Sequence, residues 1–496
     1  MCLACPPLNE KRMTSGLKTA EQYVESLRQL KLRVYFLGKR IENPADFQLT
    51  KLSQNAVAMT YTLAQDPEYS DLMTATSHLT SEKVNRFTHI PQNGDDLVKK
   101  VKMLRLLGQK TGVCFQRCVG MDALIALSSV TYEFDKKLGT QYYARFNEFL
   151  KYVQRGDLVC NGAMTDVKGD RSLRPSQQKD PDLYVRVVEK GKDGLIVRGA
   201  KAHQTGAVNS HEIIVMPTLA MGEEERDYAV SFSTPSDAKG VSHIIGRQPS
   251  DTRRLEGNEI DLGNVRYAGH EALVVFDDVF VPWDRVFMCG EHEFSGVLVD
   301  RFASYHRQNY GGCKTGLGDV LIGAAATIAE YNGVQGASHV REKITEMIHL
   351  NETMYACGLA CSYEGYKLPS GTYVVNPLLA NATKQNVTRF PFEMARLATD
   401  IAGGLVGTLP SGKDLKQPEV GKYVEKYLRG VADVPTENRM RMTRLIENMV
   451  LGVSYLVESM HGAGSPQAQR IVIFRQADLE AKKELSKVLA GISKQP

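Results

Sequence analysis

The sequence lacks any apolar run long enough to cross a bilayer. The longest, from Val320 to Ala329, ends at Glu330, well short of the roughly 18 to 20 residues that a spanning helix needs. Net charge is also small, because 61 Lys and Arg residues stand against 57 Asp and Glu residues, and the basic ones are scattered. The start of the chain lacks the pattern of a secretory signal. We therefore expect a cytoplasmic protein that binds neither membrane nor nucleic acid.

Two nucleotide-binding motifs are absent as well. The string GGCKTG would need glycine at positions 308 and 313 to form a phosphate-binding loop, but these positions hold Gln308 and Cys313. No GxGxxG follows a candidate strand, so a Rossmann site has no support. Internal repeats and low-complexity tracts are also missing.

What is present predicts an α+β fold that is mainly helical. With 496 residues and 43% apolar residues, the chain can form two or three domains with real cores. A leader over residues 1–18 precedes helical patterning over 19–155, a β-rich segment over 156–295, and helical patterning again over 296–496.

Local signals support these boundaries. Thr19 and Gln22 form a capping box that predicts the first helix. Residues 95–109 predict another, with apolar residues on one face and lysines opposite. LYVRVVEK, GKDG and LIVRGAK predict a hairpin, whereas LPSGKDLKQPEVG is typical of a loop.

Nine cysteines, an odd number, argue for buried, catalytic or metal-bound thiols rather than disulfides. Cys114 and Cys118 stand one helical turn apart and would share a face if their segment is helical. Such a pair can also be simple packing, as the similarly spaced Cys357 and Cys361 can. Cys2 and Cys5 in the leader have the CxxC spacing of zinc ribbons, but no second CxxC follows. Cys160 and Cys289 have no partner at a meaningful spacing.

A second segment adds two possible ligands. His306 and Cys313 are seven residues apart and would lie on one helical face with Tyr310 between them. Three thiolates and an imidazole suit zinc or an iron-sulfur cluster. We expect Gly311 and Gly312 to leave room beside Cys313, which favours the cluster.

Two polar segments suit a flavin nucleotide. Residues 164–180 carry Lys168, Arg171 and Arg174 around a glycine turn, which fits a pyrophosphate or simply a solvated loop. Residues 203–206 offer polar groups to a flavin ring edge.

Three further residues are candidates for proton transfer. Glu458 and His461 share a helical face before a glycine stop, and could exchange protons or form a surface pair. Glu271, before an apolar strand, is either a carboxyl with a raised pKa or an edge residue.

The ordered motifs CFQRCVGMD, MTDVKGDR, GAKAHQTG, YHRQNYGGCK, KQNVTRFP, DIAGGL and ESMHGAGSPQAQR closely resemble those of the 4-hydroxybutyryl-CoA dehydratases, from about Thr19 to the C-terminal LAGI. The wider family includes flavin monooxygenases that hydroxylate 4-hydroxyphenylacetate and is similar in fold to acyl-CoA dehydrogenases. Their fold has an N-terminal helical domain, a central β domain and a C-terminal helical bundle.

The resemblance implies a 4Fe-4S cluster on Cys114, Cys118, His306 and Cys313, and FAD as second cofactor. It further implies a homotetramer with FAD at the subunit interfaces. The implied FAD contacts are Met164, Thr165, Asp166, Lys168, Gly169, Asp170, Arg171, His203, Gln204, Thr205 and Gly206, and across the interface Lys384, Gln385, Asn386, Gly403 and Gly404.

The implied activity is an oxygen-sensitive radical dehydration of 4-hydroxybutyryl-CoA to crotonyl-CoA, with isomerisation of vinylacetyl-CoA. In this interpretation His306 is a ligand and a base, Tyr310 donates to the substrate, Glu458 and His461 transfer protons, and Glu271 is a weaker candidate. His270 stands where the family pattern leads us to expect an amide side chain. The alternatives are an aromatic monooxygenase without a cluster and a non-catalytic, zinc-stabilised scaffold.

Overall fold

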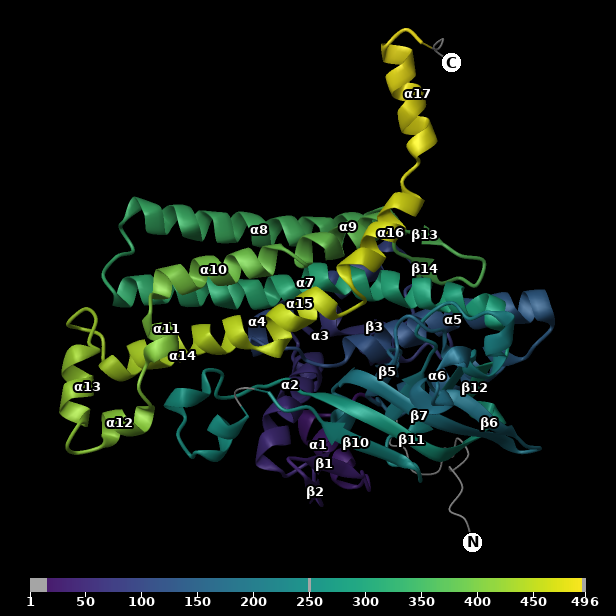
Figure 1. The fold of residues 1–496 in the computed structure, drawn as a ribbon, viewed down its shortest axis with the longest axis horizontal. Helices are drawn as coiled ribbons and strands as arrows, with labels where there is room; N and C mark the ends of the chain where they lie inside the picture. Colours follow the sequence, from purple (N-terminus) through teal and green to yellow (C-terminus); the bar gives the residue numbers. More distant parts are fainter. Residues whose placement is uncertain (1–15, 249–250, 493–496) are drawn as a thin grey trace.

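In the computed structural model, which describes residues 16–248 and 251–492, helices from the C-terminal part of the chain pack on N-terminal helices, and N-terminal helices pack on the strands from the middle of the chain (Figure 1). The N-terminal helices are α1 Ala20–Arg28, α2 Gln48–Gln65, α3 Ser70–Met73, α4 Gly94–Thr111, α5 Cys118–Leu138 and α6 Tyr142–Arg155. The predicted capping box is confirmed, because Thr19 accepts from the Gln22 amide and Gln22 accepts from the Thr19 amide. Cys2 and Cys5 lie outside the described residues.

The strands form two main sheets. The first, in the order β2-β1-β10-β11-β7-β6, contains β1 Val34–Phe36, β2 Lys39–Ile41, β6 Arg186–Lys190, β7 Gly194–Thr205, β10 Val241–Ile245 and β11 Glu271–Pro282. The second, in the order β12-β9-β8-β5, contains β5 Cys160–Ala163, β8 Glu212–Val215, β9 Val230–Pro235 and β12 Val286–Cys289. Short hairpins join β3 Thr74–Thr76 to β4 Lys83–Asn85 and β13 Tyr366–Lys367 to β14 Tyr373–Val374.

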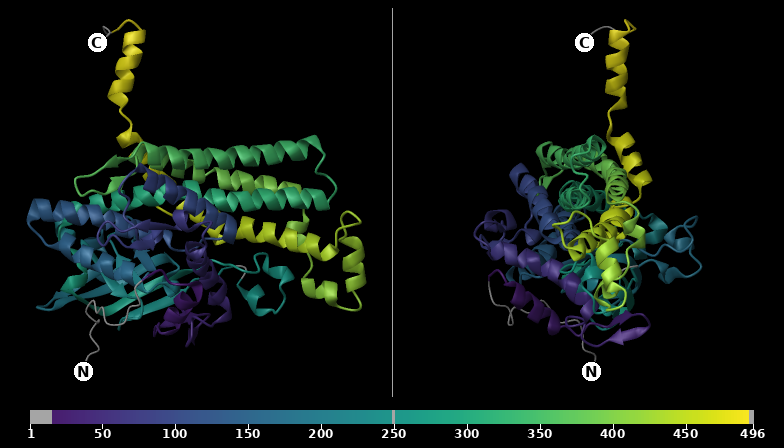
Figure 2. Two further views of the ribbon diagram at one scale, coloured as in Figure 1. Left: turned by 180° about the vertical axis from the view of Figure 1, so that it is seen from behind. Right: turned by 90° about the vertical axis from the view of Figure 1, so that its left-hand side faces the viewer.

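The C-terminal part is a helical bundle in which α7, α8 and α10 lie side by side (Figures 1 and 2). Its helices are α7 Ser295–Tyr331, α8 Ser338–Tyr363, α9 Pro377–Val387, α10 Phe390–Ala402, α11 Leu405–Thr408, α12 Gly412–Lys416, α13 Gly421–Tyr427, α14 Thr436–Leu451, α15 Glu458–His461, α16 Pro466–Gln476 and α17 Leu479–Leu489. Helix α17 buries none of its residues and projects from the body in both figures. Within the described ranges, no helix combines the length and the apolar character that crossing a membrane requires.

The predicted fold class, with helical, β and helical segments in that order, is confirmed. The predicted hairpin is confirmed as well, because β6 and β7 pair antiparallel. The segments are less separate than the sequence suggested: β1, from the N-terminal helical segment, joins the first sheet by pairing parallel to β10. The exact division at residues 155 and 295 therefore stays a prediction.

One local expectation was wrong: the segment expected to be a loop near residue 412 contains helix α12. Within the helical patterning predicted over 296–496, α14 is interrupted at Gly452, and the chain continues through a π-helical turn, Val453–Val457, into α15. Such π-turns occur often at functional sites.

Glycines bring α7 unusually close to two neighbouring helices. A Cβ added at Gly316 would lie 2.2 Å from the Arg105 carbonyl oxygen of α4, and one at Gly312 would lie 2.4 Å from the Val101 carbonyl oxygen. Gly311 meets α8 in the same way, with an added Cβ 2.6 Å from the Gly358 Cα. The expectation that Gly311 and Gly312 leave room beside Cys313 was therefore wrong, because these glycines are used for helix packing.

Gly316→Ala tests this crossing. The atoms that the new methyl group would meet are backbone and cannot turn away, so we expect a loss of about 1–3 kcal/mol in the free energy of unfolding. Gly323→Ala, at an open position on the same helix, is the matched control, with an expected gain of about 0.5–1 kcal/mol from helix propensity. Denaturant unfolding of both variants checks this, and equal stability would contradict the packing argument.

Candidate active site

The two cysteines of CFQRC do not share a helix. Cys118 is the first residue of α5, whereas Cys114 lies in the non-helical turn before it. Gln116 between them has φ 64°, a left-handed conformation that ends regular structure. The expectation of one helical face was therefore wrong, although the turn still brings both thiols to the same buried region.

Gln116 attaches this turn to the predicted flavin stretch. Its Oε1 accepts from Asn209 Nδ2 at 2.9 Å, and its Nε2 donates to the carbonyl oxygens of Ser53 and Ala268. A Cβ added at Gly206 would lie 2.6 Å from the Gln116 Cβ. The cysteine turn and residues 203–206 are thus packed directly on each other.

Tyr310 connects the thiols of the turn to α7. Burial raises the pKa of its hydroxyl well above the usual value, and the nearby Glu458, Cys313, Cys114 and Cys118 raise that pKa further. The three thiols also affect one another. Burial, Cys313 and Cys114 raise the pKa of Cys118, and the pKa of Cys313 is raised to about 11, chiefly by burial. Thiolates at this place therefore need a compensating positive charge, which a metal supplies.

His306 lies one turn before Tyr310 on α7, as the sequence predicted, and the two rings meet edge to face with centroids 5.4 Å apart. Its Nδ1 lies 2.8 Å from Asp122 Oδ2. The other Asp122 oxygen pairs with Lys100 Nζ at 2.7 Å. Lys100 was expected on the solvent face of its helix, but it is 1% exposed. Lys100 faces inward because its ammonium group pairs with the buried carboxylate of Asp122.

Lys314 and Glu458 form the charged pair of the site. Lys314 Nζ lies 2.6 Å from Glu458 Oε2 and also donates to the Ser454 carbonyl oxygen of the π-helical turn. Burial alone would lower the pKa of the Lys314 ammonium, but Glu458, Cys313 and Cys114 raise it above its usual value. The other oxygen of Glu458, Oε1, is buried without a protein partner. It is therefore a free acceptor.

Glu271 faces this pair from the first strand position of β11. Removal from water and the charge of Glu458 raise the pKa of its carboxyl well above the usual range, against the opposing effects of Thr205 and Lys314. Thr205 Oγ1 donates to Glu271 Oε2 at 2.7 Å. Two carboxyl groups therefore lie close together in environments that favour a protonated Glu271 beside an ion-paired Glu458.

Lys384 and Gly462 close the space around Tyr310. Lys384 Nζ lies 3.8 Å from the centroid of the Tyr310 ring and donates to the carbonyl oxygens of Glu458 and Ser459. A Cβ at Gly462 would lie 1.7 Å from the Tyr310 hydroxyl oxygen. Only glycine fits at that point.

Positive groups gather at the end of the site nearest the β-sheet. Burial lowers the pKa of His203, and the neighbouring Lys168, His461 and Arg171 lower it further. Lys168 and Gly169 both have positive φ, at 72° and 51°, so the loop turns sharply there. His461 is exposed and belongs to this group, whereas Glu458 belongs to the buried pair.

The other predicted flavin contacts have different surroundings. Asp166 is buried and pairs with Lys201 at 2.8 Å, a structural role in the sheet. Gln204 donates to the Ala202 carbonyl oxygen, and Asp170 caps its own turn by accepting from Ser172. Met164 offers its carbonyl oxygen to Lys201. The Thr165 carbonyl oxygen accepts a hydrogen bond from the Ala202 backbone amide.

The residues expected to reach a neighbouring subunit divide into two groups. Lys384 and Gln385 are buried within this chain, and Asn386 donates to the Cys357 sulfur. Gly403 and Gly404 end α10 in open space, with no atom within 4 Å of an added Cβ. Gly403 and Gly404 have the exposure that contact with another subunit requires, and Asn386 is partly exposed.

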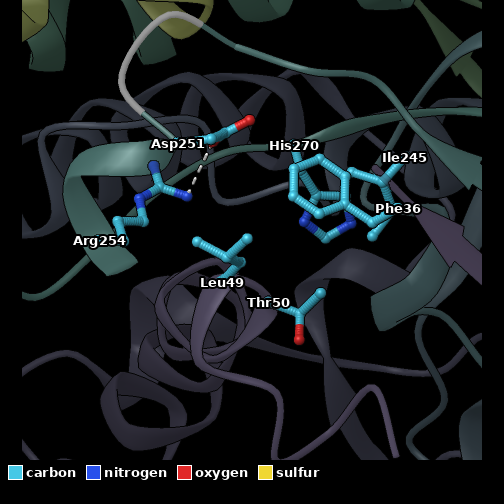
Figure 3. A pocket seen from close by; sticks show the side chains of 7 residues that line it. All are labelled: Phe36, Leu49, Thr50, Ile245, Asp251, Arg254 and His270. Atoms are coloured by element: carbon cyan, nitrogen blue, oxygen red, sulfur yellow. Dashed lines mark ion pairs between the residues drawn. The ribbon is translucent and has the colours of Figure 1, made fainter. Parts of the chain in front are cut away.

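A small pocket lies where strands β1 and β10 of the first sheet end (Figure 3). It is lined by Phe36, Leu49, Thr50, Ile245, Asp251, Arg254 and His270, and its two charged residues pair at 3.4 Å. Burial lowers the pKa of His270 to about 3, so this ring is neutral. Its Nδ1 contacts Ser53 Oγ at 2.6 Å, and Ser53 in turn accepts from Asn209, the partner of Gln116. His270 is thus linked to the cysteine turn rather than isolated.

The sequence did not single out Gln116, Asp122, Lys100 and Lys314. Lys314 directly follows the predicted ligand Cys313, and Asp122 lies four residues after the predicted ligand Cys118. This proximity is the only sequence signal for either residue. In the part of the chain that is described, no three His, Cys, Asp or Glu side chains converge tightly enough to hold a single metal ion.

The chain belongs to the 4-hydroxyphenylacetate 3-hydroxylase family. The family model for the N-terminal part of this hydroxylase matches residues 19–288, and the model for its C-terminal part matches residues 295–491.

Within this family the chain is similar to 4-hydroxybutyryl-CoA dehydratase/vinylacetyl-CoA-Delta-isomerase of Clostridium aminobutyricum, at 59% identity over 96% of this chain and 100% of the relative. It is also similar to the structure of an oxygen-tolerant archaeal 4-hydroxybutyryl-CoA dehydratase from N. maritimus, at 56% identity and a TM-score of 0.95, covering 97% of this chain and 96% of that one. The oxygenase component of the 4-hydroxyphenylacetate 3-monooxygenase of Thermus thermophilus is 26% identical over 88% of each chain.

The carboxyl of Glu271 gives the site a pH signature. Because its folded pKa is raised, the folded state keeps a proton that the unfolded state loses above about pH 4.5, so stability falls with rising pH by up to about 1.4 kcal/mol per unit until the folded pKa is reached. Glu271→Gln removes this fall, and the stability of the variant should therefore rise relative to the natural protein between about pH 5 and pH 8.

Denaturant unfolding over this range measures the difference. Glu393→Gln is the control, because a hydrogen bond from Arg396 lowers the pKa of Glu393, so its titration is complete below this range. Parallel profiles for the natural protein and Glu271→Gln would contradict the assignment of a protonated Glu271.

Proposed function

We propose that this protein dehydrates 4-hydroxybutyryl-CoA to crotonyl-CoA and isomerises vinylacetyl-CoA, as the names of its two dehydratase relatives indicate. The proposal includes FAD and a 4Fe-4S cluster. One observation carries it. Tyr310 lies within electrostatic reach of Glu458 and of all three predicted cysteine ligands, so acid-base groups and thiols share one buried space.

The residues present fit the cluster. Cys114, Cys118 and Cys313 supply thiols whose raised pKa values disfavour bare thiolates, and His306 has one nitrogen held by Asp122, which leaves the other for a metal. Such a cluster would supply a Lewis acid for the leaving hydroxyl group, and FAD would exchange single electrons with the substrate.

The side chains of the chain itself account for proton movement. Glu271, held protonated, can give a proton to the departing hydroxyl group. Glu458, with Oε1 unpartnered, can accept a proton from the acyl chain. Lys314 holds Glu458 in place, and the Lys384 side chain over the ring fixes Tyr310 for a hydrogen bond to the substrate.

The positive charges of Lys168 and Arg171, which lie beside His203, suit the pyrophosphate of FAD. We further propose a homotetramer in which Gly403 and Gly404, which are open in this chain, approach the FAD of a neighbouring subunit.

Cys313→Ala tests the cluster. We expect about four irons and about one flavin per chain in protein prepared without oxygen, and loss of most iron in the variant. Cys357→Ala, in the second CxxxC pair, should keep its iron and serves as the matched control. Flavin without iron in the unaltered protein would instead favour the aromatic monooxygenase.

Glu458→Gln tests the proton acceptor. The variant keeps the shape of the side chain but cannot take a proton, so kcat for crotonyl-CoA formation should fall by about 10²- to 10⁴-fold. Glu484→Gln, in an exposed pair on α17, should leave kcat unchanged. Equal rates for the natural protein and Glu458→Gln would remove Glu458 from the mechanism.

A further inference from the structure

Asp122 lies at the centre of a buried polar group between α4, α5 and α7. Its Oδ2 accepts from His306 Nδ1 at 2.8 Å and from Asn309 Nδ2 at 2.5 Å, and its Oδ1 accepts from Lys100 Nζ at 2.7 Å. Asp122 is 0% exposed. In the proposed site, Asp122 has so far served only as the partner of one His306 nitrogen.

These contacts fix which nitrogen of His306 carries the proton. A carboxylate only accepts hydrogen bonds, so a neutral His306 ring must hold its hydrogen on Nδ1 and leave the lone pair on Nε2. The ring plane is fixed as well, because Phe302 stacks on it with centroids 5.6 Å apart and planes 18° apart. His306 is therefore held in one tautomer and one orientation.

Lys100 in turn fixes Asp122. Its ammonium balances the buried carboxylate and lies 3.3 Å from Gln308 Oε1, on the same helix as His306. Lys100 thus connects α4 and α5 to the turn of α7 that carries the predicted ligand. A carboxylate on the outer nitrogen of a metal-bound imidazole orients the ring and strengthens it as a donor.

We propose that Asp122, supported by Lys100 and Asn309, is the positioning residue of His306 and makes Nε2 its ligating nitrogen. This inference rests on the proposed function, because it requires the iron-sulfur cluster. It gives Asp122, Lys100 and Asn309 a role in holding a ligand, which helix formation and core packing alone would not require.

Two double variants that differ by a single acceptor test this role. Lys100→Met with Asp122→Asn and Lys100→Met with Asp122→Leu both remove the buried ion pair together, so neither leaves an unpaired buried charge. The amide of the Asp122→Asn variant can still accept from His306 through its carbonyl oxygen, whereas the side chain of the Asp122→Leu variant cannot. Thr131→Val, at a buried hydroxyl on the same helix α5, is the control for lost packing.

The readouts are iron retention against a chelator and the nitrogen hyperfine coupling of the reduced cluster in pulsed EPR. We expect the leucine variant to bind iron roughly 10- to 100-fold more weakly and to lose the nitrogen coupling, and the asparagine variant and Thr131→Val to keep both. A leucine variant with iron and coupling like the natural protein would overturn the positioning role alone, as would a folded asparagine variant without the coupling. Absence of iron from the unaltered protein would instead overturn the proposed function, and this inference with it.

Discussion

The site depends on the close crossing of α4 and α7. Glycine at positions 312 and 316 lets two backbones touch where any side chain would separate them, and the rest of the site is built on the α7 surface fixed in this way. His306, Tyr310, Cys313 and Lys314 all belong to this helix. Lys100 on α4 contacts both Gln308 on α7 and the Asp122 carboxylate beside His306. Direct packing of the two backbones thus fixes the distance between α4 and α7, which long flexible side chains alone would not do.

Charge is distributed unevenly over the site, and Glu458 interacts with several of its titratable groups. It forms an ion pair with Lys314, influences the Tyr310 hydroxyl and opposes ionisation of Glu271. Its position follows from the interruption at Gly452, since the π-helical turn after it presents the Ser454 carbonyl oxygen to Lys314. The two carboxyl groups differ in their partners: Glu458 pairs with the Lys314 ammonium, whereas burial and the charge of Glu458 raise the pKa of Glu271 despite its hydrogen bond from Thr205.

Much of this could be predicted from the sequence. Periodicity gave the order of helical and β segments, and spacing correctly placed His306, Tyr310 and Cys313 on one helix. It failed for Cys114 and Cys118, because the left-handed Gln116 between them leaves no mark in a helical period. It also failed for Lys100, because this residue lies in a lysine-rich stretch that predicts a solvent-exposed face, and its buried partner Asp122 is distant in the sequence. The influence of Glu458 on the Glu271 pKa and the packing of Gln116 on Gly206 join distant segments, and both depend on tertiary packing that no local pattern contains.

The contact between Gly462 and Tyr310 has a consequence for sequence variation. The hydroxyl oxygen of the tyrosine occupies the space in which every other residue would place its first side-chain carbon. The two positions are consequently coupled across the bundle. A library that varied residue 462 would therefore recover glycine. Loss of the hydroxyl alone would not admit alanine, because the added Cβ would still lie 2.8 Å from the Glu458 carbonyl oxygen and 2.9 Å from the ring carbon Cζ of residue 310.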